Sequence, residues 1–421
     1  MSLIYAEYLN GISPGYVAEL WPPVFERGSG KWLYDCDGGQ YLDLDAGWGA
    51  MVLGHAHPEV TQATIQALEK LEHATPPTFP MVELMGRLTE ILAPWDLNKF
   101  MFGVSGSEAV EHALEMAVLK SGGKRKVLVL DRCYHGSAIG LLPISFPTSG
   151  LAALSGVIPV PAPTPFCYRC PFNLTVQNCQ RECVSALRSL VAKDKDELAG
   201  VLIEPVLGKE GIPLPEGYLS AVGSICAEFR IPLIIDEVKT GIGRCGAIFA
   251  SEMEDVQPDI MIMGKALSNG FPLSVAVFKE SACPPEFVSM GVVLQTTFSG
   301  HAVACARAVK TLDVARRKKL HENAAVMGKA LIEALRDLLK SDNSVGDIRG
   351  AGMLIGVEFV ADRETKRLST SALTRFVSSC RRAGLHVATI FRNTLTLTPP
   401  LILDMGDIDE MMDRLKKELQ L

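Results

Sequence analysis

Residues 232–241, PLIIDEVKTG, carry the clearest fold signal in this sequence. The segment begins as an apolar, β-branched run and ends on two carboxylates, Asp236 and Glu237, and a lysine, Lys239. A short run without polar residues is typical of a strand that is buried on both faces of a parallel sheet. Ligands of such sheets bind at the carboxyl ends of the strands, so Asp236 is expected to face a positive charge.

Three further runs have the same character: RKVLVLD (125–131), AGVLIEPV (199–206) and PDIMIMGK (258–265). A helical pattern, GYLSAVGSICAEFRI (217–231), connects the second of these runs to PLIIDEVKTG. Strands that alternate with helices predict an α/β fold with a mostly parallel sheet covered on both faces. The predicted strand ends carry polar residues, namely Asp131, Glu204, Asp236 and Lys265.

The character of the sequence changes after residue 305. Residues 302–340 read as one long helical stretch, and strand patterns follow at 350–360 and 394–403, which together predict a smaller α+β domain. The Pro-rich residues 156–173 are expected to form an irregular surface excursion. The predicted division is an N-terminal segment (1–55) that packs with the small domain, a large domain (56–305) and a C-terminal small domain (306–421).

Bulk composition excludes several classes of partner. The 421 residues have a net charge of −7 and no basic stripe, so nucleic acid and anionic membranes are poor partners. No apolar run reaches the roughly 18 residues needed to cross a bilayer, and the N-terminus lacks the pattern of a secretory signal. The 11 cysteines favour reduced thiols. These features predict a cytoplasmic protein.

Four cysteines form the spacing C-x2-C-x8-C-x3-C, at Cys167, Cys170, Cys179 and Cys183. This spacing is compatible with a tetrahedral zinc site. The cluster lies in and just after the Pro-rich excursion, away from the predicted strand ends. We therefore favour free or partly oxidised thiols, keep a structural metal as the alternative, and assign no metal to the active site.

Lys265 and Asp236 indicate a cofactor. A lysine in an apolar setting either extends to solvent or acts as a Schiff-base lysine, because burial of its charge is costly. Asp236 ends another strand 29 residues earlier. A pyridine aldehyde would use both groups, with an imine on Lys265 and a carboxylate beside its ring nitrogen.

Two further segments supply a phosphate site and a ring contact. Ser105, Gly106 and Ser107 directly precede a helical pattern, where free N–H groups and the helix dipole attract an anion, although an ordinary Ser N-cap is the alternative. In CYHGSAIG (133–140), Tyr134 can stack on a flat ring or can be a packed surface aromatic, and His135 follows it. Together the segments indicate pyridoxal 5'-phosphate (PLP).

The ordered set of segments resembles the class III (omega) aminotransferases, which are PLP-dependent enzymes of fold type I. The resemblance runs nearly end to end and is carried by SGSEAVEHAL, CYHG, IEPVLGKEG, IDEVKTGIGRCG, DIMIMGKALSNGFPLS, TTFSGHAVACARA, GDIRGAGMLIGVEF and TPPL. It implies a large, mostly parallel-sheet domain and a smaller α+β domain. It also implies a PLP-dependent transferase that acts on an amino acid or amine through an external aldimine and a quinonoid carbanion.

The resemblance also implies roles for individual residues. Lys265 would form the imine and move protons, and Asp236 would pair with the pyridine nitrogen. Thr297 would reach the phosphate in a neighbouring subunit, which requires a homodimer or tetramer. The remaining cofactor contacts implied are Val238 and Tyr134 on the two ring faces, Ser105, Gly106 and Ser107 at the phosphate, and His135 and Glu204 near the ring.

Two positions that many family members use to bind a substrate carboxylate are changed together. The arginine three residues before PPL is Thr396 here, and the glutamate that pairs with it is replaced by Lys209. The paired change predicts non-standard substrate recognition. Arg392 or Lys209 could take over the carboxylate, or both could be solvated surface charges.

Lys239 is the third departure, because the family usually has Gln or a neutral residue there. With YHG and the ending without arginine, it resembles α-amino-ε-caprolactam racemases of the same family. The leading prediction is an aminotransferase, and the alternatives are a racemase or epimerase of amino acids or amino amides, or an elimination, decarboxylation or carbon–carbon bond-forming enzyme. Glu210 or Lys209 could exchange a proton on the second face of the ring. Trp48 and the segment around Tyr16 are expected at the entrance.

Overall fold

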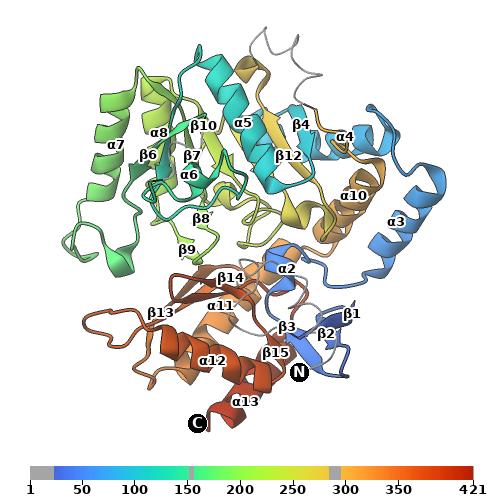
Figure 1. The fold of residues 1–421 in the computed structure, drawn as a ribbon, viewed down its shortest axis with the longest axis vertical. Coiled ribbons are helices and arrows are strands. Elements are labelled where there is room, and N and C mark those ends of the chain that lie inside the picture. Colours follow the sequence, from blue (N-terminus) through green and yellow to red (C-terminus); the bar gives the residue numbers. More distant parts are fainter. Residues whose placement is uncertain (1–22, 151–155, 284–294, 421) are drawn as a thin grey trace.

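The computed structural model describes residues 23–150, 156–283 and 295–420. The described elements form two parts, which Figure 1 shows one above the other. The upper part contains a seven-stranded sheet with its helices, and the lower part contains two four-stranded sheets with helices α11, α12 and α13.

The seven-stranded sheet has the order β4-β12-β11-β10-β7-β5-β6. All of its strands run parallel except β12, which is antiparallel to both of its neighbours. Strands β5, β7, β10 and β11 were predicted from the sequence and are confirmed, whereas β4 and β12 were not predicted. The bounds are β4 Lys99–Gly103, β5 Lys126–Leu130, β6 Ile158–Ala162, β7 Leu198–Ile203, β10 Leu233–Asp236, β11 Ile260–Met263 and β12 Ser274–Phe278.

The prediction of an irregular excursion over residues 156–173 was wrong in its first part. Residues Ile158–Ala162 form β6, which pairs in parallel with β5 at the edge of the sheet. Ile158 N donates to Arg125 O and Ala162 O accepts from Asp131 N, whereas Pro159 and Pro161 alternate with the bonded residues. An edge strand has one unpaired side, so a proline without an N–H is tolerated there.

Helices cover the upper sheet. Helix α5 (Gly106–Lys120) packs against β12, β11 and β7, while α7 (Glu182–Asp194) packs against α8 (Tyr218–Phe229). Helices α3 (Pro58–Lys70) and α4 (Phe79–Leu92) pack against α10 (Ala302–Arg317). The middle strands are buried along their length, as expected for a sheet covered on both faces.

The long helical stretch predicted over residues 302–340 is two helices. Helix α10 ends at Arg317, and α11 (Leu320–Leu338) begins three residues later. Lys319 between them has φ 49°, a left-handed conformation that a continuous helix does not contain. The break lets α10 pack against α3 and α4 while α11 packs against β13 and α13 in the lower part.

The lower part combines the two ends of the chain. One sheet has the order β13-β14-β17-β16, and the other has the order β1-β2-β3-β15. Strand β15 pairs in parallel with β3 through Leu385 and Leu42, so N-terminal strands join a C-terminal one. The bounds are β1 Phe25–Ser29, β2 Trp32–Asp35, β3 Gln40–Asp43, β13 Val345–Ala351, β14 Leu354–Phe359, β15 Leu385–His386, β16 Thr389–Phe391 and β17 Thr394–Leu397.

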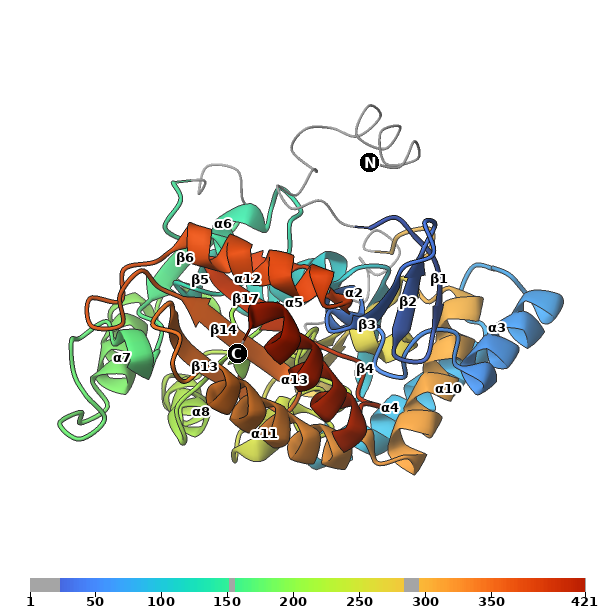
Figure 2. The same ribbon diagram turned by 90° about the horizontal axis from the view of Figure 1, so that it is seen from below.

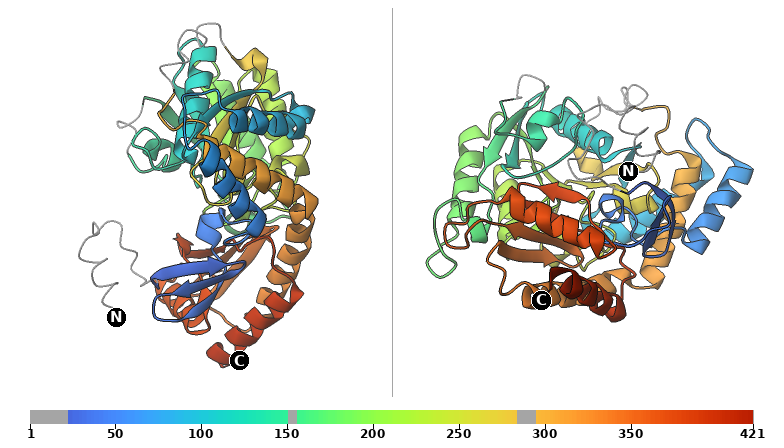
Figure 3. Two further views of the ribbon diagram at one scale, coloured as in Figure 1. Left: turned by 90° about the vertical axis from the view of Figure 1, so that its right-hand side faces the viewer. Right: turned by 60° about the horizontal axis from the view of Figure 1, so that its bottom comes forward.

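Helices of the lower part lie on the face turned away from the upper part. Figure 2 shows α11, α12 (Thr370–Arg382) and α13 (Met405–Leu419) in front of β13 and β14 when the molecule is viewed from below. Figure 3 shows β1, β2 and β3 beside the C-terminal strands. The domain limits of 1–55, 56–305 and 306–421 remain predictions.

Two findings concern the cysteines and the membrane. All 11 cysteines lie in the described ranges and are free thiols. Within those ranges, no three His, Cys, Asp or Glu side chains are arranged to hold a metal ion, and this includes the four clustered cysteines. No helix of the described chain is long and apolar enough to span a membrane.

Candidate active site

A cavity of about 400 Å³ lies where β7, β10 and β11 end, between the upper sheet and strand β16 of the lower part. Its position is the one expected for a ligand of a parallel sheet. Most of the site residues predicted from the sequence line this cavity together: Trp48, Gly106, Ser107, Tyr134, His135, Glu204, Lys209, Asp236, Val238, Lys239 and Lys265.

Asp236, at the end of β10, is buried and held in one orientation. Its Oδ2 lies 2.8 Å from His135 Nδ1, and its Oδ1 accepts a hydrogen bond of 2.9 Å from the N–H of Val238. Burial opposes a charged His135, whereas Cys133 and Asp236 favour it, and the net result is a pKa of His135 well above its ordinary value. The sheet therefore presents a carboxylate that is already fixed for a cationic partner.

Lys265 follows β11 and opens a short 3-10 turn, Lys265–Ser268. Its φ of 36° lies in the left-handed region, which costs free energy for a residue with a side chain. Burial lowers the pKa of its amine below the usual value, although Asp236 and Glu204 act in the opposite direction. A lysine held in this way is suited to nucleophilic attack on an aldehyde.

The N-terminus of α5 faces the same cavity. Ser105 is the N-cap, and its Oγ accepts a hydrogen bond from Glu108 N. The N–H groups of Gly106 and Ser107 donate no hydrogen bond within the described residues. A side chain at Gly106 would place its Cβ 2.9 Å from Val238 Cγ1, so glycine keeps this corner open. Free N–H groups at a helix start are a binding place for phosphate.

Glu204 connects the turn of Tyr134 to the segment after β7. Its two carboxylate oxygens accept hydrogen bonds from Tyr134 N at 3.0 Å and from Gly208 N at 2.9 Å. Burial raises the pKa of Glu204 above its usual value. The side chain therefore fixes two backbone turns of the cavity wall.

Lys209 lies among three aromatic rings. Its Nζ is 3.9 Å from the ring centre of Tyr134, 4.4 Å from that of Phe391 and 5.2 Å from that of Phe146. Burial lowers its pKa, and the ring faces offer cation–π stabilisation to the ammonium. Thr396 supports the backbone of this residue, because its Oγ1 donates a 2.6 Å hydrogen bond to Lys209 O.

Glu210 is fully buried and occupies the nearby arginines. Arg132 donates to it through Nε at 3.1 Å and through Nη2, and Arg392 Nη1 lies 3.9 Å from its Oε1. A carboxylate that is paired with one arginine and lies beside a second is not free to exchange a proton with a ligand. Arg132 and Arg392 are likewise already engaged by Glu210, so neither is available to bind a ligand without giving up this contact.

Lys239 lies on the turn after β10 and lines the cavity. A side chain at Gly208 would place its Cβ 2.8 Å from Lys239 Cδ, so the lysine runs directly over this glycine. Burial is the largest of the effects that lower the pKa of Lys239 to about 7, and the charges of Lys265 and Arg244 act in the same direction.

Some predicted site residues lie outside the lining. Ser105, Arg392 and Thr396 are not among the lining residues, and Thr297 is exposed at the surface. The segment around Tyr16 lies outside the described residues. Conversely, Phe391 and Phe146 were not predicted from the sequence, because neither belongs to a segment with a recognisable motif.

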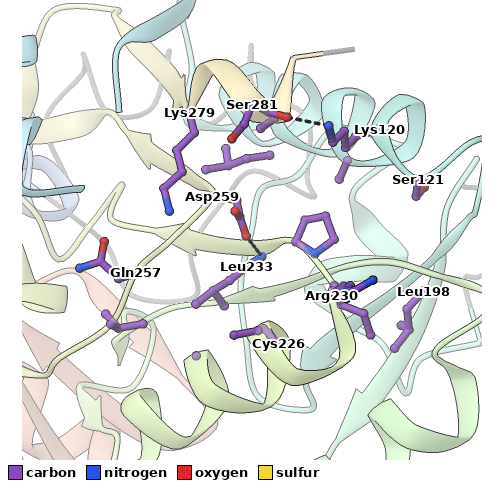
Figure 4. A pocket seen from close by; sticks show the side chains of 18 of the residues that line it. Lys120, Ser121, Leu198, Cys226, Arg230, Leu233, Gln257, Asp259, Lys279 and Ser281 are labelled. Carbon is purple, nitrogen blue, oxygen red and sulfur yellow. Dashed lines mark hydrogen bonds between the residues drawn. The ribbon is translucent and has the colours of Figure 1, made fainter. Parts of the chain in front are cut away.

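A larger cavity, of about 780 Å³, lies at the opposite edge of the upper sheet, where β7, β10 and β11 begin (Figure 4). Several of its polar groups are already used within the protein. Asp259 Oδ2 accepts from Leu233 N at 2.8 Å, and Lys120 Nζ donates to Ser281 O at 2.6 Å, as Figure 4 shows. It lacks the combination of strand-end acid, strained lysine and free helix N-terminus that marks the smaller cavity.

Comparisons with known proteins find similarity over nearly the whole chain. A family model described as aminotransferase class-III matches residues 17–419. An adenosylmethionine-8-amino-7-oxononanoate aminotransferase of Geobacter sulfurreducens is 32% identical over 422 residues, covering 94% of this chain and 92% of the relative. A leucine/methionine racemase of Thermococcus litoralis is 31% identical over 410 residues, covering 94% and 90%.

A solved structure shares the whole architecture. It is an amine transaminase from an uncultivated Pseudomonas species, in its PLP-bound internal aldimine form. It superimposes with a TM-score of 0.89 at 29% identity and covers 97% of this chain and 98% of its own.

Proposed function

The chain belongs to the class-III aminotransferase family, and we propose that it transfers the amino group of an amino acid or amine with non-standard substrate recognition. It has the fold type I architecture of transaminases and is a PLP-dependent transferase. The observation that carries the proposal is the convergence of Lys265, Asp236 and the α5 N-terminus in one cavity.

The residues present fit PLP. The buried carboxylate of Asp236 suits a pyridinium nitrogen, and the free N–H groups of Gly106 and Ser107 suit a phosphate. Lys265 would hold the cofactor covalently. Tyr134 and Val238 both line the cavity, which supports their placement on the faces of the ring.

When bound, PLP supplies an electron-withdrawing ring that weakens the bonds to the α carbon of the substrate. Asp236 would keep the ring nitrogen cationic, and His135 holds Asp236 in place through the 2.8 Å contact. The Nζ of Lys265 would be the group that takes up and returns a proton at the α carbon of the substrate. Its lowered pKa favours the neutral form needed for this role.

The absence of an arginine at Thr396 supports a substrate set different from that of many family members. Thr396 donates its hydroxyl to Lys209 O and lies behind the cavity wall. A carboxylate switch of the usual Arg–Glu kind therefore has no counterpart at these two positions.

The experiment is spectroscopic. Purified PLP-loaded protein is mixed with candidate amino acids and amines in deuterium oxide, without any keto acid. Transamination predicts conversion of the cofactor to pyridoxamine phosphate and release of a keto product. If no amine alters the spectrum of the bound cofactor, the proposal is wrong.

A second candidate function is racemisation or epimerisation of an amino acid or amino amide. It is supported by the similarity to a leucine/methionine racemase and by Lys239, a second lysine in the cavity. Glu210 does not support racemisation as a second proton-exchanging group, because Arg132 already pairs with it. Deuterium incorporation at the α carbon with loss of optical activity, and without a keto acid, would distinguish this function.

We also propose a homodimer or tetramer in which Thr297 contacts the phosphate of a neighbouring subunit. Thr297 is exposed and outside the cavity of its own chain, and the adjacent Phe298 is 54% exposed. Mixing Lys265→Ala and Thr297→Val subunits should restore one intact site per mixed dimer. A monomer in light scattering would contradict the proposal.

The 11 free thiols support a cytoplasmic location, which fluorescence of a tagged chain would test.

A further inference from the structure

More basic side chains than acidic ones line the cofactor cavity. Three lysines line it: Lys209, Lys239 and Lys265. Of the two acids in the lining, Asp236 is bonded to His135, and burial raises the pKa of Glu204 and so favours its neutral form. Covalent attachment of PLP to Lys265 removes one lysine from the balance.

Lys209 and the arginines already have partners. The ammonium of Lys209 lies against the rings of Tyr134 and Phe391. Arg132 and Arg392 both face Glu210. None of these three cations is therefore free to receive a ligand without giving up a contact.

Lys239 differs from all of them. Its Nζ makes no hydrogen bond and no ion pair within the described residues, although it lines the cavity. The charged groups that act on it from nearby elements are Lys265 and Arg244, which disfavour its charge, and Asp45 and Glu204, which favour it. A buried ammonium without a direct counterion is costly, and an anion that enters the cavity would offset that cost.

The backbone keeps Lys239 in this position. The side chain passes over Gly208, where any Cβ would lie 2.8 Å from Lys239 Cδ and 3.2 Å from its Cβ. Gly208 is itself fixed by the hydrogen bond from its N–H to Glu204. Gly208, which has no side chain, therefore leaves room for the long side chain of Lys239 at the cavity wall.

We propose that Lys239 binds the carboxylate of the substrate, so that this enzyme acts on amino acids in preference to amines that lack a carboxylate. The inference deepens the proposed function, since it requires the reacting amine to enter this cavity. The phosphate of the cofactor does not compete for Lys239, because α5 offers it a separate site.

The test measures binding of ligands that cannot react. PLP-loaded protein is titrated by calorimetry with three carboxylates that lack an amino group: propanoate, 4-methylpentanoate and 3-phenylpropanoate. Each is compared with its uncharged amide. The wild type should bind at least one carboxylate about tenfold more tightly than its amide, and Lys239→Met should lose that preference while its affinity for the amide is unchanged. Lys239→Arg should retain it, and Lys279→Met, in the other cavity, is the matched control.

The pH dependence gives a second readout. The pKa of Lys239 is about 7 while Lys265 lowers it with its own charge, and attachment of PLP to Lys265 would remove that charge and raise the pKa of Lys239. The affinity of the loaded protein should be constant below this raised pKa and fall by up to about tenfold per pH unit above it, because carboxylate binding there requires uptake of a proton. In Lys239→Met this slope should disappear. Gly208→Ala, which displaces Lys239 without removing its amine, should weaken carboxylate binding as Lys239→Met does.

The outcomes separate the inference from the proposed function. If the protein forms no covalent complex with PLP, the proposed function fails. If PLP binds and amines react, but no carboxylate is preferred over its amide, the inference alone is overturned. It is also overturned if Lys239→Met alters the resting spectrum of bound PLP and leaves carboxylate binding unchanged, because Lys239 would then serve the cofactor.

Discussion

The two sides of the cavity are built differently. The proposed cofactor side consists of Gly106, Tyr134, His135, Asp236 and Lys265, which all line the cavity. The proposed substrate side consists of Lys209 and Lys239 in the lining, together with Glu210, Arg392 and Thr396 outside it. On the cofactor side, Asp236 has a fixed partner for each of its oxygens. Near the substrate side, Lys209, Arg392 and the neighbouring Arg132 have protein partners. Lys239 has none within the described residues. The orientation of Asp236 is therefore fixed before any ligand binds, whereas Lys239 is proposed to gain its partner from the ligand.

Lys265→Ala should have the largest effect, because it removes the covalent anchor and the proton carrier from the cofactor side. Turnover should fall by about 10³-fold or more. Borohydride reduction followed by mass spectrometry should no longer fix PLP to the chain. Lys279→Ala is the control and should keep both properties. Retention of fixed PLP at another lysine in Lys265→Ala would contradict the assignment.

Asp236→Asn should come next, with a fall in kcat of about 10²-fold. The amide keeps the size of the carboxylate but cannot hold a cationic ring nitrogen, and it removes one cause of the raised pKa of His135. Steady-state kinetics and the PLP dissociation constant measure the effect. Asp255→Asn, at an exposed acid beside the larger cavity, should behave like the wild type. Equal kinetics in the two variants would remove Asp236 from the cofactor side.

Glu210→Gln tests how the substrate side holds its arginines. Glu210 is fully buried, so its loss leaves Arg132 without its paired carboxylate and should cost about 3 kcal/mol in the free energy of unfolding. Urea unfolding measures this change. Glu228→Gln is matched to it, because that glutamate pairs with Arg188 in the open and should contribute close to nothing. Similar midpoints for both variants would show that the buried pair is not stabilising.

Thr396→Val should have the smallest effect. It removes the 2.6 Å hydrogen bond to Lys209 O and should lower the free energy of unfolding by about 1 kcal/mol. Substrate preference should change little, because Thr396 lies behind the cavity wall. A loss of carboxylate binding as large as that in Lys239→Met would instead place Thr396 in direct contact with the substrate.

Most of the cofactor side could be predicted from the sequence. Asp236 and Lys265 stand at the ends of apolar runs, and Ser105–Ser107 directly precede a helical pattern, so each signal lies within a few adjacent residues. Local patterns also have limits. Two prolines hid the edge strand β6, because the sequence does not say which strand lies at an edge.

The residues of the substrate side could be predicted from the sequence, but the contacts among them could not. Arg392, Lys209, Lys239 and Thr396 were all candidates, and nothing in their spacing ranked them. The bond from Thr396 to Lys209 joins residues 187 positions apart, and the contact of Arg132 with Glu210 spans 78. The first contact joins the lower part to the upper part, and the second joins two segments of the upper part that follow β5 and β8 (Val206–Leu207).

The sequence by itself therefore indicated the fold and PLP as the cofactor, and it predicted the residues proposed to anchor PLP, because strand ends and helix starts are specified by neighbouring residues. Only the tertiary structure decided which cation of the substrate side is left open. That depends on which carboxylates and rings come within a few ångströms of each cation. Distance in space, and not separation along the chain, sets whether a charge is already neutralised or is ready for a ligand.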